Sequence, residues 1–194
     1  MSMQAFLVST GVVAVSEIGD KTQLLALLLA ARFKRPLPIV AGIVVATLFN
    51  HAIAGALGAW LSAAVNPDYL RWGLGLLFIG MGVWALIPDK LDDAKLDETA
   101  TTFGIFWITT VAFFLAEMGD KTQLATAALA ARFAAVVQVV AGTTLGMLIA
   151  DVPAVFLGHL FSEQAKGSWV RYVAATLFIA LGVATLVPGL VPEL

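Results

Sequence analysis

Six long runs of this sequence contain no Asp, Glu, Lys or Arg, and they limit how the chain can fold. They cover residues 1–16, 36–67, 72–88, 99–116, 133–150 and 172–192. A transmembrane helix needs about 20 mostly apolar residues, so these runs predict membrane spans. Only 12% of the residues are charged, about half the share found in soluble domains. We therefore predict an all-α integral membrane protein with six transmembrane helices.

The first and fourth runs are too short to cross a bilayer alone, so each of these spans must continue through the charged motif that follows it. The expected helices lie near residues 4–31, 37–62, 70–88, 103–131, 135–160 and 170–188. The N-terminus lacks the basic region and the small-residue cleavage pattern of a signal peptide, so we expect the first helix to stay in the mature protein. An acidic linker at 89–102 separates the two halves, residues 1–88 and 103–194.

Composition and residue types exclude several functions. The sequence has no cysteine, which removes disulfides and thiolate chemistry. A formal net charge of −2 gives no basic surface for nucleic acid. The sequence also lacks a His-rich site or a nucleophile constellation, so we expect no enzymatic activity.

The basic residues of the predicted loops indicate an orientation. One side of the membrane would hold Arg32, Lys34, Arg35, Lys90, Lys95, Lys166 and Arg171, and the other side only Arg71 and Arg132. Because cytoplasmic loops carry an excess of Lys and Arg, the first side is predicted to face the cytoplasm. Both termini are then expected outside it.

A duplication sets the predicted architecture. The stretch EIGDKTQLLALLLAARF at 17–33 matches EMGDKTQLATAALAARF at 117–133 in 12 of 17 positions, with no gap. Weaker identities extend the match over three predicted helices in each half. Because three is an odd number, the second copy enters the membrane from the opposite side. The chain is thus predicted to form two inverted-topology three-helix repeats, a pattern typical of transporters.

Small residues recur four positions apart in the second and fifth predicted helices. They are Gly42 with Ala46, Gly142 with Gly146, Ala54 with Gly58 and Ala154 with Gly158. Such pairs allow helix backbones to approach closely in membranes. We expect both helices to pack tightly against the motif helices.

Each motif places two carboxylates and an ammonium near the middle of a predicted span: Glu17, Asp20 and Lys21 in the first, and Glu117, Asp120 and Lys121 in the second. On a regular helix the carboxylates of one motif share a face, while Thr22 points elsewhere unless the helix breaks. Gly19 and Gly119 permit such a break. The alternative is a purely structural pair between Glu17 and Lys21. Each ionised group costs about 2.5 to 3.5 kcal/mol at the membrane centre, which favours a function.

If the two motifs face each other, four carboxylates and two lysines leave a net charge of −2, which suits one divalent cation. Carboxylate, amide and hydroxyl oxygens favour hard ions such as Mn²⁺ and Ca²⁺, with Mg²⁺ less favoured because it loses its water reluctantly. Without metal, crowded carboxylates are expected to bind protons. We hypothesise that competition between metal and protons couples their transport.

The predicted metal ligands are Glu17, Asp20, Glu117 and Asp120. Further candidates for metal binding or proton coupling are Lys21, Lys121, Gln23, Gln123, Thr22, Thr122, Asn50, His51 and Asp151. An Asp within an apolar span is functional by default, so Asp151 is expected to handle an ion or a proton. His51 would relay a proton or form an interhelical hydrogen bond, and Asn50 would lend an amide oxygen to the metal.

The doubled motif, Glu-φ-Gly-Asp-Lys-Thr at 17–22 and 117–122 (φ, an apolar residue), resembles that of the small Mn²⁺ or Ca²⁺/H⁺ antiporters of Golgi, chloroplast and bacterial membranes. The chain is most similar to the bacterial manganese exporters of this family. The resemblance implies export of cytoplasmic Mn²⁺, or Ca²⁺, across the bacterial inner membrane in exchange for H⁺. It implies no cofactor beyond the transported cation.

Several alternatives stay open at this point. A passive divalent-cation channel could use the same ligands, and a Ca²⁺/Na⁺-type exchanger would replace the proton by Na⁺. The residues themselves indicate only a hard divalent cation. The preference for Mn²⁺ or Ca²⁺, the stoichiometry and the oligomeric state are also open.

Overall fold

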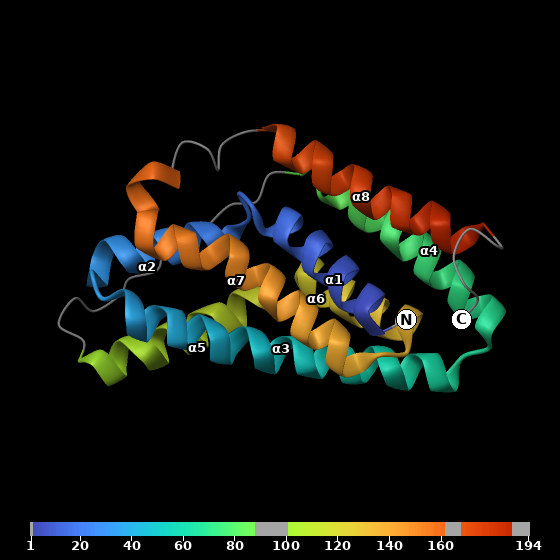
Figure 1. The fold of residues 1–194 in the computed structure, drawn as a ribbon, viewed down its shortest axis with the longest axis horizontal. Helices are drawn as coiled ribbons and strands as arrows, with labels where there is room; N and C mark the ends of the chain where they lie inside the picture. The colour runs from blue at the N-terminus through green and yellow to red at the C-terminus, as the bar shows by residue number, and fades with distance from the viewer. Residues whose placement is uncertain (1, 88–100, 162–167, 188–194) are drawn as a thin grey trace.

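The computed structural model describes residues 2–87, 101–161 and 168–187, and every regular element in these ranges is a helix (Figure 1). The elements are α1 (Ser2–Glu17), α2 (Lys21–Phe33), α3 (Pro36–Ala64), α4 (Pro67–Trp84), α5 (Thr102–Glu117), α6 (Lys121–Phe133), α7 (Val136–Phe161) and α8 (Ser168–Leu186). The all-α prediction is confirmed for the described residues. The predicted linker lies almost wholly outside them.

The spans predicted near 4–31 and 103–131 are not continuous helices, because each is broken at its motif. Gly19 has a φ of 80° and Gly119 a φ of 74°, in the left-handed region that glycine adopts readily. The axes of α5 and α6 are bent by 70° at this point. The structure interrupts both helices at the glycines that permit a break, so the uninterrupted helices drawn through the motifs were wrong.

Corresponding helices of the two halves run in opposite directions along the long axis of the molecule. In the view of Figure 1, α1, α4 and α7 run from right to left, whereas α3, α5 and α8 run from left to right. The packing is paired in the same way: α1 packs on α7, α5 packs on α3, and α4 packs on α8. Each half is thereby completed by helices of the other.

Glycines bring α3 and α7 close to the motif helices, as the small-residue pattern predicts. A Cβ added at Gly42 would lie 2.7 Å from Cβ of Thr109 on α5, and one at Gly142 would lie 2.5 Å from the carbonyl oxygen of Phe6 on α1. Neither distance leaves room for a larger residue. The prediction of tight packing is confirmed at these two positions.

Large apolar side chains are exposed on the outer faces of the described helices. Phe49 and Leu57 of α3 and Leu76 of α4 expose 58 to 63% of their surface, an arrangement suited to lipid.

By length and composition, two helical segments within the described residues could cross a membrane: α3 and residues 136–156 of α7. The bent pair α5 and α6 would add a third. The break leaves α1 and α2 only 16 and 13 residues long, so neither qualifies alone. The six-span arrangement and its orientation remain predictions.

Candidate metal centre

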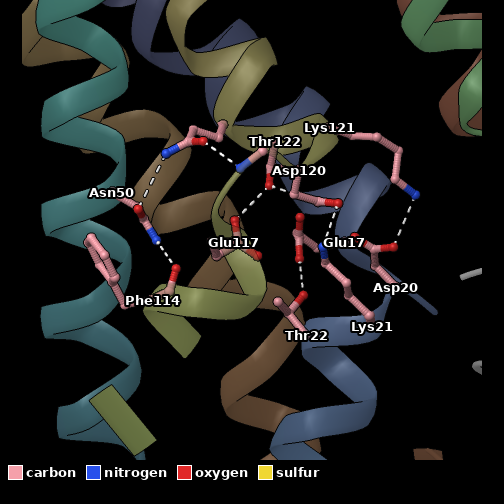
Figure 2. A network of polar contacts seen from close by, with 12 residues as sticks. Glu17, Asp20, Lys21, Thr22, Asn50, Phe114, Glu117, Asp120, Lys121 and Thr122 are labelled. Atoms are coloured by element: carbon pink, nitrogen blue, oxygen red, sulfur yellow. Dashed lines mark hydrogen bonds and ion pairs between the residues drawn. The ribbon is translucent and has the colours of Figure 1, made fainter. Parts of the chain in front are cut away.

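The two helix breaks place both motifs at one buried location, where residues 100 positions apart in the sequence face each other (Figure 2). Glu17 is the last residue of α1, and Asp20 stands at the N-cap of α2. Glu117 and Asp120 hold the same positions at the end of α5 and the start of α6. All four side chains are buried, with at most 3% of the residue surface exposed. The aspartates also lie at the positive ends of the helix dipoles, which favours their negative charge.

The lysines form ion pairs across the two motifs. Lys21 Nζ lies 2.9 Å from Asp120 Oδ1, and Lys121 Nζ lies 3.0 Å from Asp20 Oδ1. The structural pair considered above would have joined Lys21 to Glu17 within one helix. The break redirects α2, so the ammonium reaches the other motif instead. Each half of the chain therefore neutralises an aspartate of the other half.

The same breaks turn the threonines back onto the glutamates. Thr22 Oγ1 donates a hydrogen bond of 2.5 Å to Glu17 Oε2, and Thr122 Oγ1 donates one of 2.8 Å to Glu117 Oε2. On an unbroken helix Thr22 was expected to point away. One oxygen of each glutamate is thus held in place, and the other, Oε1, is buried without a hydrogen-bond partner in the described part of the chain.

The glutamines fasten the backbone of each break. The amide N–H of Gly19 donates to Gln23 Oε1, and that of Gly119 donates to Gln123 Oε1, both at 2.8 Å. These bonds satisfy amide groups that the helix breaks leave without an intrahelical partner. In the described state the two glutamine oxygens therefore stabilise the loops that carry the carboxylates.

Three of the predicted ligands are close enough to share an ion. One oxygen each from Glu17, Asp20 and Asp120 lies within 4.8 Å of the other two. Oxygens that share one Ca²⁺ lie up to about 5 Å apart, since each Ca–O bond is about 2.3 to 2.6 Å long. Glu117 lies outside this group but interacts electrostatically with Asp20 and Asp120. Only oxygen donors occur here, which suits a hard cation.

Asn50 was expected to lend its amide oxygen to the metal, but in the structure this oxygen accepts a hydrogen bond from a side chain. Its Nδ2 donates to the carbonyl oxygen of Phe114 at 3.0 Å, and its Oδ1 accepts from Gln123 Nε2 at 3.3 Å (Figure 2). In the first motif, Gln23 Nε2 donates to the carbonyl oxygen of Ala150 at 3.0 Å. Sequence reasoning missed both carbonyls, because backbone acceptors leave no signal in residue identity.

His51 on α3 and Asp151 on α7 are the remaining candidates. Both residues are fully buried, and none of their four side-chain polar atoms has a hydrogen-bond partner among the residues that the structure describes. Asp151 interacts electrostatically with Glu17 and with Glu117. It therefore lies near the metal-binding candidates, on a helix that carries neither motif.

The helices expose apolar side chains and bury a set of paired carboxylates and lysines. These features are typical of membrane proteins that handle cations inside the bilayer. A protein-family model described as "Divalent cation/proton antiporter GDT1" matches residues 5–93 and again residues 105–193. The chain belongs to this family of transporters, and the family domain occurs twice in it.

Individual relatives agree with this assignment. The chain is 48% identical over 184 residues to a Vibrio cholerae protein named "Putative manganese exporter", covering 94% of this chain and 90% of that protein. It is 29% identical to GDT1-like protein sll0615 of Synechocystis, covering 94% and 97% of the two chains. It is 28% identical to GDT1-like protein 4 of rice, covering 93% of this chain and 72% of the rice protein. No solved structure matches the chain.

Proposed function

We propose that this protein exports a hard divalent cation, Mn²⁺ in the first place and Ca²⁺ in the second, from the cytoplasm in exchange for H⁺. The observation that carries the proposal is the buried meeting of the two motifs, with their crossed ion pairs. The family's description supplies the proton as the exchanged ion, and the name of the Vibrio relative favours manganese.

The charge of the motifs supports a divalent substrate. Lys121 and Lys21 compensate Asp20 and Asp120, so the two glutamates carry the remaining charge of −2. An uncompensated charge in a low-dielectric interior is strongly unfavourable. One divalent cation or two protons would neutralise this charge. Because the two carry the same charge, either can replace the other in the site.

The opposed directions of corresponding helices support an arrangement of six spans as two inverted repeats. In such proteins the substrate binds near the middle of the membrane between the repeats, often beside broken helices. Movement of one half against the other would expose the site to each side in turn. We place both termini outside the cytoplasm of a bacterial inner membrane, following the distribution of Lys and Arg.

Transport into proteoliposomes tests the proposal. With an imposed pH gradient, we expect the purified protein to move Mn²⁺ and Ca²⁺ against their own gradients. Asp20→Asn and Asp120→Asn should each abolish this uptake, because each removes a buried carboxylate of the site. Asp68→Asn is the matched control, since Asp68 has a side chain that is 81% exposed and lies outside the motifs.

The same experiment separates the alternatives. A passive channel would move the cation in response to voltage alone, and a sodium-coupled exchanger would respond to a Na⁺ gradient instead. An unchanged rate of metal transport after collapse of the proton gradient, with no other ion gradient present, would contradict proton exchange. Intact transport in both motif variants would contradict the site.

A further inference from the structure

The turn between α2 and α3 and the turn between α6 and α7 share their backbone conformation but not their charge. Lys34 has a φ of 51° and Ala134 a φ of 48°, so both turns pass through the left-handed region at the same position. Lys34 and Arg35 are exposed in the first turn, whereas Ala134 and Ala135 hold these positions in the second. Two cationic side chains therefore belong to one copy of the turn alone.

Arg35 connects this basic turn (Lys34 and Arg35) to the start of α5. Its Nη1 donates a hydrogen bond of 2.8 Å to Oγ1 of Thr102. Figure 1 shows the end of α2, the start of α3 and the start of α5 at the left end of the molecule. Among the described residues, no carboxylate pairs with Lys34 or Arg35. A guanidinium has five N–H donors, so the bond to Thr102 leaves others directed to the surroundings.

An aromatic cluster (Phe103, Phe106 and Trp107) follows directly on α5. The three rings contact one another, with centroids 5.3 to 6.4 Å apart. Phe103 is 70% exposed and Trp107 is 49% exposed. Along the helix axis these two residues lie about 2 and 8 Å beyond Thr102. The exposed rings therefore begin next to the residue that Arg35 contacts.

The opposite end of the molecule has neither feature. The residues of α1 that correspond to Phe103 and Trp107 are Met3 and Leu7, and the starts of α1 and α7 lie at the right end in Figure 1. The basic turn comes from the first half of the chain and the aromatic cluster from the second. The fold nevertheless brings both to the same end.

We propose that the basic turn and the aromatic cluster together bind the headgroup of an anionic phospholipid. Arginine binds phosphate oxygens through parallel N–H donors, and basic side chains beside a membrane attract anionic lipids. Aromatic side chains such as Trp are enriched at the depth of the headgroups. A free anion would match the two cations but would leave the rings exposed to water. A lipid matches both, with its phosphate at Arg35 and its glycerol and upper acyl chains against the rings.

A lipid bound here contacts both halves of the chain, so it should stabilise the folded protein. A ligand that binds only the folded state raises the unfolding temperature. The inference requires that the helices lie in a bilayer, but it does not depend on which ion is transported. It can therefore fail while the proposed transport holds, and the reverse is also true.

Thermal unfolding of the full-length purified protein in mixed micelles tests the site. We expect phosphatidylglycerol to raise the unfolding temperature more than phosphatidylcholine with the same acyl chains. Most of this difference should be lost in Arg35→Gln, and all of it in the double variant Lys34→Gln with Arg35→Gln. Arg71→Gln is the matched control, since Arg71 lies near the start of α4 at the other end of the molecule. An equal loss in Arg71→Gln would contradict a specific site.

Lys34→Gln alone covers the case in which loss of the bond to Thr102 disturbs folding, because this variant keeps Arg35. It should lose part of the phosphatidylglycerol effect and unfold in phosphatidylcholine at the temperature of the unchanged protein. Native mass spectrometry supplies a direct measurement of binding. The double variant should raise the Kd for phosphatidylglycerol at least about tenfold, and an unchanged Kd would overturn the proposal.

Two variants test the aromatic cluster. Trp107→Ala should reduce the phosphatidylglycerol effect although it changes no charge. Ala134→Lys with Ala135→Arg puts the same charges on the second turn, which has no such cluster beside it, and should add little to the effect. If these added charges gave as much stabilisation as the basic turn itself, charge alone would explain lipid binding and the proposed site would be wrong.

Further measurements separate the lipid from other occupants. Inorganic phosphate without phosphatidylglycerol should leave the unfolding temperature unchanged, and stabilisation equal to that by the lipid would mean a site for free anions. Asp97 and Glu98 shortly precede Thr102 in the sequence. If phosphatidylglycerol stabilised the protein only after Asp97→Asn with Glu98→Gln, acidic residues of the chain itself would occupy the basic turn. Either result would overturn the lipid site.

Discussion

The two motifs have the same residues at every polar position, yet the structure surrounds them differently. The side chain of Lys21 is 24% exposed, whereas that of Lys121 is 5% exposed. Around the second break, Asn50 holds both the end of α5, through the carbonyl of Phe114, and the start of α6, through Gln123. The corresponding residue around the first break is Ala150, which offers only its backbone carbonyl.

This comparison teaches that the duplicated residues build the symmetric part of the centre, whereas unduplicated positions on α3 and α7 make its halves unequal. The second break is held on both sides by one amide side chain. Among the described residues, the hydrogen bond that α7 makes to the first break reaches only Gln23 on α2, and the lysine of the first motif is the more accessible one. We therefore expect the first motif to be the more mobile half.

The largest difference should come from the lysines. Lys121→Met should lower the free energy of unfolding by about 3 to 5 kcal/mol, because it removes one partner of a buried ion pair. Lys21→Met should lower it less, by about 1 to 3 kcal/mol, because the Lys21 side chain is 24% exposed and its replacement opens a route by which water can reach the buried Asp120. Chemical unfolding in the same detergent would compare them. Equal losses in the two variants would contradict a difference between the two ion pairs. As a control, adding Asp20→Asn to Lys121→Met should restore part of the lost stability, because it removes the carboxylate left without its lysine.

The second-largest loss of stability should follow removal of the side-chain amide of Asn50. Asn50→Ala leaves the carbonyl of Phe114 and the amide of Gln123 without their partners, at a cost of about 1 to 3 kcal/mol. Hydrogen–deuterium exchange of the segment 118–120 should then become as fast as exchange of the segment 18–20. If the two segments already exchange at equal rates in the unchanged protein, Asn50 does not distinguish the breaks.

The glycines of the two breaks should instead behave alike. Gly119→Ala forces a side chain into the left-handed region at a cost of about 1 to 2 kcal/mol, and no atom lies within 4 Å of the added Cβ. Gly19→Ala has a similar φ and should show the same loss in a thermal unfolding experiment. A much larger effect at Gly19 would mean that the two backbones differ more than their torsion angles indicate.

The smallest effect is expected from adding the missing amide. Ala150→Asn places an amide at the position that corresponds to Asn50 and should change the unfolding free energy by less than about 1 kcal/mol. Exchange at 18–20 should slow if the new side chain reaches the end of α1. Metal transport should slow with it while Mn²⁺ binding is kept. Faster transport would contradict a mobile first half.

Particular residues show what the sequence could predict. The helical class and the close approach of Gly42 and Gly142 follow from composition and local pattern, and the structure agrees with them. Gly19 and Gly119 permit the breaks, but spacing alone led to continuous helices. The membership of the antiporter family followed from the doubled motif. The assignment of individual metal ligands and the six spans remain predictions.

Other features depend on geometry that sequence spacing does not contain. The direction taken after each break decides that Lys21 reaches Asp120 and that Thr22 returns to Glu17. A regular helix, the only reference that spacing provides, puts both side chains elsewhere. The hydrogen bond from Asn50 to a backbone carbonyl of α5 depends in the same way on how α3 packs against the other half.

The crossed lysines have a consequence for biogenesis. A fragment that ended after α4 would place Asp20 and Lys21 in the lipid without the charges that neutralise them, and the complementary fragment would meet the same difficulty with Asp120 and Lys121. Neither fragment should accumulate when expressed alone, whereas co-expression should recover both.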